Sequence, residues 1–187
     1  MLKTKASIFL FILFFLACIL FFFRPLLYHI HSEKTLPPSH LQTLVGNASQ
    51  ALSSNDVPVG AMIIYNDSIL STGYNTVYRD SNAGGHAEIN AISNAIQKIG
   101  FETFSKLDRN KLILVSTFEP CMMCKGAIIE YNIRHVYFIK GKGLLHWLKN
   151  DGKQFRYEWN KFQTGGEEIQ DSLFLLHPEY RMKNIPE

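Results

Sequence analysis

The chain has 187 residues, of which 47% are hydrophobic and 19% are charged, and its formal net charge is +3. These values exclude a disordered or fibrous chain and indicate one globular domain with an additional segment. Its three cysteines are too few for the disulfide framework of a small secreted protein. Two of them, Cys121 and Cys124, lie close together in the sequence, which favours a metal site or a redox pair.

An uncharged, apolar run extends from Ala6 to Phe23. At about 1.5 Å per residue, a helix over this run comes close to the roughly 30 Å thickness of the bilayer hydrocarbon. The run would also fit the start of a signal peptide, but no small-residue cleavage site follows it. We therefore predict one N-terminal transmembrane helix, an anchor over residues 1–27 and a single-pass membrane location. Basic residues on both flanks leave open on which side of the membrane the main domain lies.

The segment over residues 28–38 ends in Pro37–Pro38 and predicts a linker. The main domain is predicted over residues 39–187. It opens with a helix from Ser39 or His40 to about Ser54, where apolar residues have helical spacing. The later elements are a hairpin of strands over Val59–Tyr65 and Ile69–Tyr74, a helix from His86 to Gly100, a strand over Lys111–Thr117, a helix over Pro120–Tyr131 and a strand over His135–Lys140. Strands that alternate with helices imply an α/β domain whose sheet is covered on both faces.

The C-terminal part of the chain is basic and aromatic. Between Arg134 and Lys161 there are seven Lys or Arg residues and two acids, and Phe155–Trp159 alternates like a strand with one aromatic face. Such a segment can bind an RNA backbone and stack on exposed bases. An aromatic face on a strand is also typical of a protein core, and the surplus charge of solvated surface. A closing helix is predicted over Glu167–Leu176.

Two short segments, His86–Glu88 and Pro120–Cys124, begin two of the predicted helices. One imidazole from His86 and two thiolates from Cys121 and Cys124 make a zinc site that lacks one ligand. An open fourth position distinguishes a catalytic zinc from a structural one. The positive ends of two helix dipoles favour thiolate over thiol at this point. Glu88 supplies a carboxylate that can take a proton from water and return it to a leaving amine.

Five segments occur in an order that matches a known family: Pro58–Ala61, Gly73–Asn75, His86–Glu88, Pro120–Cys124 and Val136–Ile139. In them the chain resembles the zinc-dependent nucleobase and nucleoside deaminases, the cytidine-deaminase-like superfamily with its CMP/dCMP-type deaminase domain. Within it, the motifs are most similar to those of the tRNA adenosine deaminases and the guanine deaminases. The resemblance implies a three-layer α/β/α fold with a central mixed sheet. It ends near Lys140, so the C-terminal part is divergent from about residue 141.

The resemblance also implies roles for individual residues. His86, Cys121 and Cys124 would bind one Zn²⁺ per chain, and Glu88 would be the catalytic proton shuttle. Asn75 would read the edge of the base, since its amide has one donor and one acceptor face. Further contacts with the substrate are expected from the residues that flank these motifs, namely Pro58, Val59, Gly60, Ala87 and Pro120. The family also implies a homodimer.

The function expected from these features is hydrolytic removal of an exocyclic amine, as ammonia, from a nucleobase or nucleoside, with a purine of guanine or adenine type favoured. Deamination of adenosine to inosine in tRNA is an alternative, and it requires a flipped nucleotide and contacts beyond the pocket. A membrane-tethered thiol–disulfide redox protein is an alternative of another class, although His86 and Glu88 count against it. A structural zinc completed by His135 or His146 would leave Glu88 unexplained.

Overall fold

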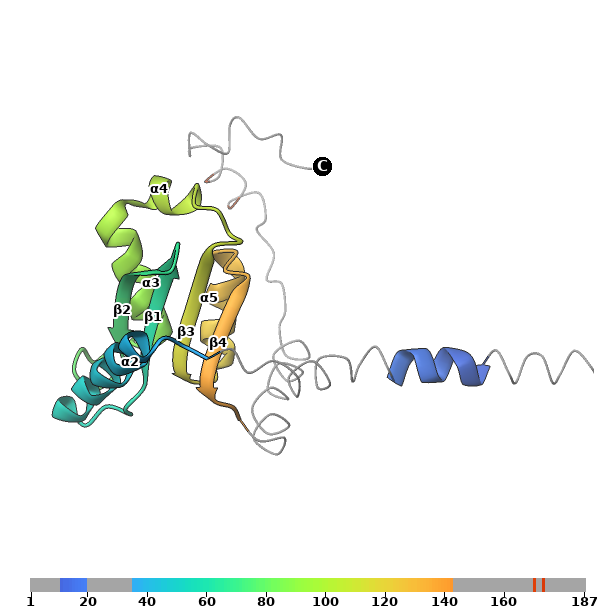
Figure 1. Ribbon diagram of the computed structural model, residues 1–187, viewed down its shortest axis with the longest axis horizontal. Coiled ribbons are helices and arrows are strands. Elements are labelled where there is room, and N and C mark those ends of the chain that lie inside the picture. The colour runs from blue at the N-terminus through green and yellow to red at the C-terminus, as the bar shows by residue number, and fades with distance from the viewer. Residues whose placement is uncertain (1–10, 20–34, 143–169, 171–172, 174–187) are drawn as a thin grey trace, which may run out of the picture. The chain divides into compact units, whose positions relative to one another are not determined.

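The computed structural model describes residues 11–19, 35–142, 170 and 173 (Figure 1). The chain divides into two units at Gly141, and the sheet and the candidate site both belong to the first. The predicted strand Phe155–Trp159 and most of the basic C-terminal segment lie outside the described residues. So does the closing helix predicted over Glu167–Leu176, except for residues 170 and 173, which are helical.

The predicted transmembrane helix and single-pass membrane location are wrong. Within the apolar run the structure describes residues 11–19, which form a helix. Nowhere in the described ranges is a helix both long enough and apolar enough to cross a membrane. The sequence prediction relied on the length and composition of the run alone.

Four strands form one mixed sheet in the order β2-β1-β3-β4. β1 (Gly60–Tyr65) is antiparallel to both β2 (Ser68–Tyr74) and β3 (Leu112–Phe118), whereas β4 (His135–Lys140) is parallel to β3. This confirms the predicted central mixed sheet. The four strands also match the four that the sequence predicts, with bounds that differ by one residue at most.

The hairpin between β1 and β2 is confirmed, and its turn has a clear sequence cause. Asn66 and Asp67 have φ angles of 51° and 60°. Two-residue hairpin loops of the type that requires positive φ at both positions match the twist of the flanking strands, and Asn and Asp tolerate this conformation.

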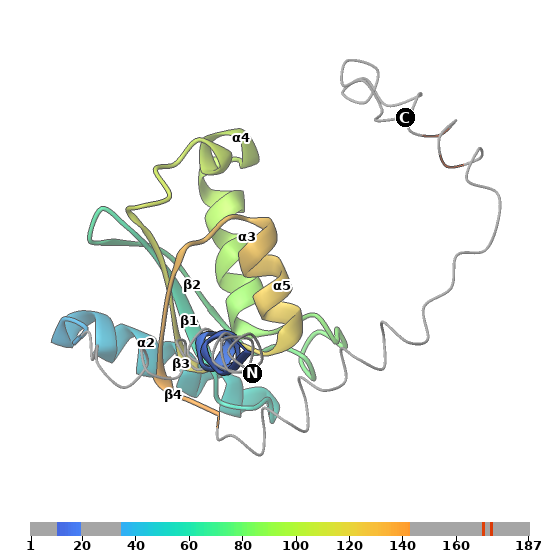
Figure 2. The same cartoon turned by 90° about the vertical axis from the view of Figure 1, so that its right-hand side faces the viewer.

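The helices cover both faces of the sheet (Figures 1 and 2). α2 (Pro38–Gln50) continues as a short 3₁₀ helix over Ala51–Ser54 and packs on one face, chiefly against β1 and β2. α3 (Ala87–Ile99) and α5 (Met122–Glu130) lie on the other face, and α3 contacts both β2 and β1. Two helical layers around one sheet are the three-layer α/β/α arrangement predicted from the sequence. A short helix, α4 (Phe101–Ser105), follows α3 and was not predicted.

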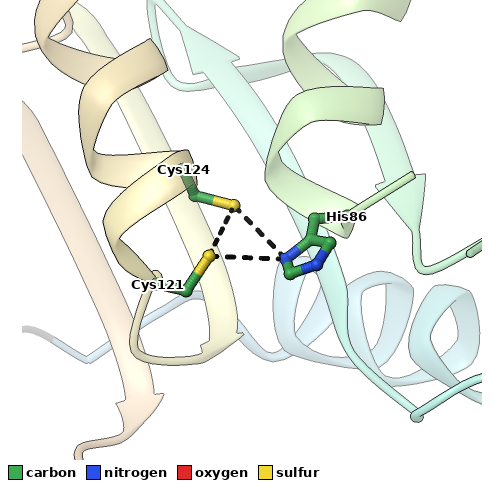
Figure 3. A group of neighbouring side chains, drawn as sticks. All are labelled: His86, Cys121 and Cys124. Carbon is green, nitrogen blue, oxygen red and sulfur yellow. Dashed lines mark hydrogen bonds between the residues drawn. The ribbon is translucent and has the colours of Figure 1, made fainter. Parts of the chain in front are cut away.

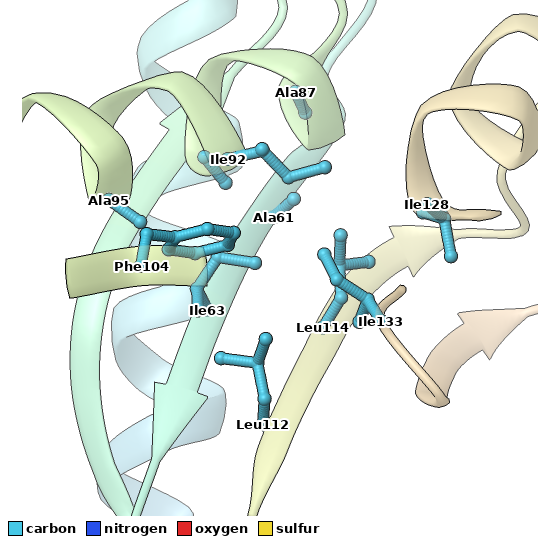
Figure 4. Packing of buried hydrophobic residues seen from close by; sticks show 11 residues of the cluster. Ala61, Ile63, Ala87, Ile92, Ala95, Phe104, Leu112, Leu114, Ile128 and Ile133 are labelled. Atoms are coloured by element: carbon cyan, nitrogen blue, oxygen red, sulfur yellow. The ribbon is translucent and has the colours of Figure 1, made fainter. Parts of the chain in front are cut away.

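Alternation along β1 divides the hydrophobic core into two parts. Ala61 and Ile63 face α3 and α5 in the larger core cluster, which Figure 4 shows from close by. Met62 and Ile64 face the opposite side, where they pack with Leu44 of α2 in a smaller cluster. Successive side chains of a strand point to opposite faces, so one apolar strand supports both helical layers. The central strand β1 therefore fixes the position of each layer.

Gly73 lets α3 approach the sheet very closely. A Cβ atom at this position of β2 would overlap backbone atoms of α3 at Ala87, Asn90 and Ala91. Only glycine permits such backbone proximity without moving the helix. This contact places the first turn of α3, which carries the candidate site, directly against the end of β2.

Candidate metal centre and active site

The three predicted metal ligands come together at the starts of two helices (Figure 3). His86 is the residue before the first turn of α3, Cys121 is the residue before the first turn of α5, and Cys124 lies in that turn. The Sγ atom of Cys121 is 3.5 Å from His86 Nδ1 and 3.6 Å from Cys124 Sγ. The Sγ atom of Cys124 is 3.6 Å from the same imidazole nitrogen.

This triangle fits a zinc ion. With Zn–S of about 2.3 Å and Zn–N of about 2.0–2.1 Å, donor atoms of a tetrahedral site are roughly 3.4–3.8 Å apart. Across residues 11–19 and 35–142, the group of side chains able to hold a metal contains these three alone. His135 is described and is not part of it, whereas His146 lies outside the described residues. The donor set is therefore one imidazole and two sulfurs, as the sequence predicts.

The electrostatics of the cysteine pair favour a thiolate. The hydrogen bond between the two sulfurs, together with backbone N–H groups and nearby His86, lowers the pKa of Cys121 to about 4. The same hydrogen bond, together with burial, raises the pKa of Cys124. The two sulfurs therefore hold one proton between them. Zinc ligands must be deprotonated, so a bound dication would favour release of that proton as well.

Glu88 lies beside the ligand triangle and is almost completely buried, with 3% of its surface exposed. It is in the first turn of α3, two residues after His86. Its Oε2 atom is 3.4 Å from Cys124 Sγ, and its Oε1 atom is 3.3 Å from the hydroxyl of Ser116 on β3. A carboxylate is thus held next to the metal ligands, where a proton shuttle would have to be. Ser116 has no motif signal and was not predicted to belong to the site.

Asn75 follows β2 and is buried against the start of α3. Its Oδ1 atom accepts a hydrogen bond of 2.9 Å from the backbone N–H of Ala87. The backbone N–H of Asn75 donates a hydrogen bond of 3.1 Å to the carbonyl oxygen of Val59. Three of the predicted substrate-contact residues are therefore neighbours of one another. The Asn75 Oδ1 atom thus accepts one hydrogen bond from the start of the helix, and the Nδ2 donor is a separate part of the hydrogen-bonding capacity of the amide.

The other predicted substrate-contact residues differ in how deeply they are buried. Gly60 begins β1, is buried, and donates its N–H to Thr117 Oγ1 at 3.1 Å. Pro120 is buried next to Cys121, whereas Pro58 is exposed. The carbonyl oxygen of Gly60 is also 3.4 Å from Ser116 Oγ, the hydroxyl that contacts Glu88. Whether any of these residues contacts a substrate stays a prediction.

Comparison with known proteins gives one family. Residues 38–140 match the model of the cytidine and deoxycytidylate deaminase zinc-binding region. The tRNA-specific adenosine deaminase 2 of Xenopus laevis is 30% identical over 146 residues, which cover 73% of this chain and 82% of that protein. The tRNA-specific adenosine deaminase of Rickettsia bellii is 38% identical over 93 residues, covering 49% of this chain and 61% of that protein.

The fold has a counterpart among solved structures. The guanine deaminase from Bacillus subtilis superposes with a TM-score of 0.58 at 22% sequence identity, covering 82% of this chain and 99% of that chain. This likeness concerns the fold alone. Together with the family match over more than half of the chain and the His86, Cys121 and Cys124 triangle, it confirms the resemblance stated from the sequence. The chain therefore belongs to the cytidine and deoxycytidylate deaminase family, and it is a hydrolytic deaminase that uses one zinc ion.

Proposed function

We propose that this chain deaminates adenosine to inosine within tRNA, releasing the exocyclic amine as ammonia. The observation that carries the chemistry is the buried Glu88 carboxylate, 3.4 Å from Cys124 in the ligand triangle. The substrate class is supported by relatives from Xenopus laevis and Rickettsia bellii, whose names describe tRNA-specific adenosine deaminases. The wider class, a nucleobase or nucleoside amine, follows from the family.

Glu88 is the residue proposed to move protons. A zinc ion held by His86, Cys121 and Cys124 supplies, when bound, a Lewis acid that makes water nucleophilic near neutral pH. The Glu88 carboxylate accepts one proton from the attacking water and delivers it to the departing amine. Water adds its oxygen to the ring carbon, the C–N bond breaks, and ammonia leaves. The carboxylate returns to its starting charge, as a general base that becomes a general acid must.

Burial of this carboxylate supports the proposal. Glu88 is 3% exposed, so bulk water does not surround it. A proton that it accepts is therefore passed to the bound substrate more readily than to solvent, which is one use of a closed active site. Its two oxygens have different neighbours, Ser116 and Cys124, so the plane of the carboxylate has a defined orientation.

Asn75 is proposed to recognise the base through its Nδ2 donor. The Ala87 N–H uses one lone pair of Oδ1, whereas the Nδ2 group keeps its N–H donors for the base. Each purine edge carries ring nitrogens or a carbonyl that can accept such a bond.

Two substitutions separate recognition of the base from support of the helix. Asn75→Asp keeps an oxygen for the Ala87 N–H and removes the Nδ2 donor, whereas Asn75→Ala removes both. We expect Asn75→Asp to raise KM about 10- to 100-fold, as loss of one buried hydrogen bond does, with a Tm close to that of the parent. Asn75→Ala is expected to raise KM similarly and to lower Tm as well. Steady-state kinetics and thermal unfolding measure both, and an unchanged KM in Asn75→Asp would restrict Asn75 to a structural role.

A substrate panel tests the proposed function directly. We expect zinc-loaded full-length chain to release ammonia from an anticodon stem-loop RNA that carries adenosine, and to leave inosine in that RNA. Guanine, adenine, cytosine and their nucleosides are the comparison substrates, and the same stem-loop with guanosine in place of adenosine is the matched control. Turnover of free guanine without turnover of the RNA would replace tRNA adenosine by a free purine as the substrate.

Three further proposals concern the domain limits, the oligomeric state and the binding of RNA. They are the domain limits at residues 28–38 and 39–187, the homodimer, and RNA binding by the basic segment between Arg134 and Lys161, and all three remain predictions from the sequence. Contacts beyond the pocket are needed for a flipped nucleotide, so the RNA-binding proposal fits the tRNA substrate. Binding of the stem-loop to full-length chain, compared with the free nucleoside, measures how much of the affinity comes from outside the pocket.

A further inference from the structure

Ser116 is a buried polar residue that the proposed reaction does not use. It lies on the central strand β3, where it pairs with Ala61 of β1 and Phe138 of β4. None of its surface is exposed. Its neighbours along the strand include Leu114 and Val115, both buried in the core. A hydroxyl group in such surroundings is unfavourable unless it makes a hydrogen bond.

Two acceptors are within reach of the Ser116 hydroxyl. Its Oγ atom is 3.3 Å from Glu88 Oε1 and 3.4 Å from the carbonyl oxygen of Gly60. The hydroxyl has one proton to donate. A carboxylate is a stronger acceptor than a neutral carbonyl, because the bond is assisted by charge. The proton of Ser116 is therefore directed to Glu88.

The opposite oxygen of Glu88 points toward the metal ligands. Oε2 is 3.4 Å from Cys124 Sγ, so the carboxylate lies between the serine on β3 and the ligand triangle. A cysteine that ligates zinc has lost its proton and no longer donates to a carboxylate. The contact with Ser116 does not depend on that proton.

We infer that Ser116 is a positioning residue, which holds Oε1 of Glu88 so that Oε2 faces the His86, Cys121 and Cys124 triangle. The inference rests on the proposed function, because it assigns a purpose to the orientation of the proposed proton shuttle. Glutamate has several rotatable bonds and a terminal torsion with broad preferences. A hydrogen bond to one oxygen restricts that torsion, and a misplacement of about 1 Å at a reacting group can cost 100-fold in rate.

Ser116→Ala tests the inference, because it removes the hydroxyl and leaves the strand intact. We expect kcat on the stem-loop RNA to fall about 10- to 100-fold, with KM within a factor of about two and one zinc per chain retained. Ser116→Thr keeps a hydroxyl at the same position and is expected to recover most of the lost kcat. This split between kcat and KM, with rescue by threonine, is what a positioning role predicts.

Ser71→Ala is the matched control. Ser71 is also a buried serine on a strand, and its hydroxyl donates to Ala91 O of the same helix α3 at 2.6 Å. It therefore supports α3 without touching Glu88. A general loosening of the helix would lower kcat in both alanine variants, whereas positioning of Glu88 lowers it in Ser116→Ala alone.

Infrared spectroscopy tests the contact between Ser116 and Glu88 independently of turnover. The carboxylate stretching bands of Glu88 can be identified as those that disappear from the infrared spectrum in Glu88→Gln. We expect these bands to shift in zinc-loaded Ser116→Ala and to remain unchanged in Ser71→Ala. If the parent releases no ammonia, the proposed function fails, while the bands still report on the contact. Unshifted bands, or a Ser116→Ala enzyme with the kcat of the parent, would overturn the inference.

Discussion

Replacing Glu88 by glutamine is expected to abolish deamination while the zinc stays bound. Glu88→Gln preserves the size and shape of the side chain and removes its ability to accept a proton. General acid–base catalysis by one positioned group contributes about 10²- to 10⁴-fold. We expect kcat to fall by about that factor, because the proposed reaction uses the carboxylate twice, once as a base and once as an acid.

Retention of zinc follows from the geometry of the site. The atoms of the ligand triangle belong to His86, Cys121 and Cys124, and the carboxylate contacts the triangle only through Cys124 at 3.4 Å. The metal content of the purified variant, measured by elemental analysis, is therefore expected to remain at one zinc per chain. Its Tm is expected to remain close to that of the parent, since glutamine can still hydrogen-bond to Ser116.

Glu102→Gln provides a matched control for the loss of one negative charge. Glu102 lies in the first turn of α4 and forms an exposed ion pair with Lys106 at 2.6 Å. Exposed pairs of this kind contribute about 0–1 kcal/mol to stability. Ammonia release by Glu102→Gln should match that of the parent. Parental activity in Glu88→Gln would remove Glu88 from the reaction and with it the proposed proton shuttle.

The zinc ligands could be predicted from the sequence because each lies at the start of a helix whose boundary is visible in the residues. Pro120 precedes the turn that begins with Cys121, and His86 follows two glycines and begins the apolar stripe of α3. The hairpin was equally visible, since Asn66 and Asp67 adopt the positive φ angles that their types tolerate. At these positions the local conformational preference of each residue type agrees with the conformation that it has in the fold.

The missed features depend on contacts that span the sequence. Ser116 and Glu88 are 28 residues apart, and nothing in the run of β3 distinguishes a serine that meets a carboxylate from one that does not. The hydrogen bond accepted by Asn75 Oδ1 depends likewise on where the backbone of Ala87 lies. The short helix α4 is too brief to show a periodic pattern, although its Phe104 is buried and packs edge-on against the ring of Tyr131.

The N-terminal apolar run illustrates a different limit. Apolar composition predicts that a segment avoids water, and it does not by itself show that the segment crosses a membrane. By contrast, the helix predicted from Ser39 or His40 to about Ser54 corresponds to α2 and the 3₁₀ helix that follows it. Pro38, which the sequence analysis placed in the linker, begins α2, where a missing N–H has no cost.

Replacing Cys124 by alanine is expected to remove the metal itself. Cys124 is completely buried, and its sulfur is 3.6 Å from both His86 Nδ1 and Cys121 Sγ. Without it, one imidazole and one thiolate remain, which is too few for a stable zinc site. We expect Cys124→Ala to purify with much less than one zinc per chain and to release no ammonia. Cys18→Ala, which removes the cysteine outside the triangle, should keep both zinc and activity.

Loss of the metal should also lower stability, because the ligands join the starts of α3 and α5. Zinc present at 1,000 times its Kd stabilises the folded state by about 4 kcal/mol. In a chain of this size each kcal/mol shifts Tm by about 2–4 °C, so we expect Tm to fall by roughly 10 °C. A chelator should lower the Tm of the parent by a similar amount and have little further effect on Cys124→Ala. A parent protein that holds no zinc and instead cycles a Cys121–Cys124 disulfide with dithiols would contradict the metal site, and the redox alternative would take its place.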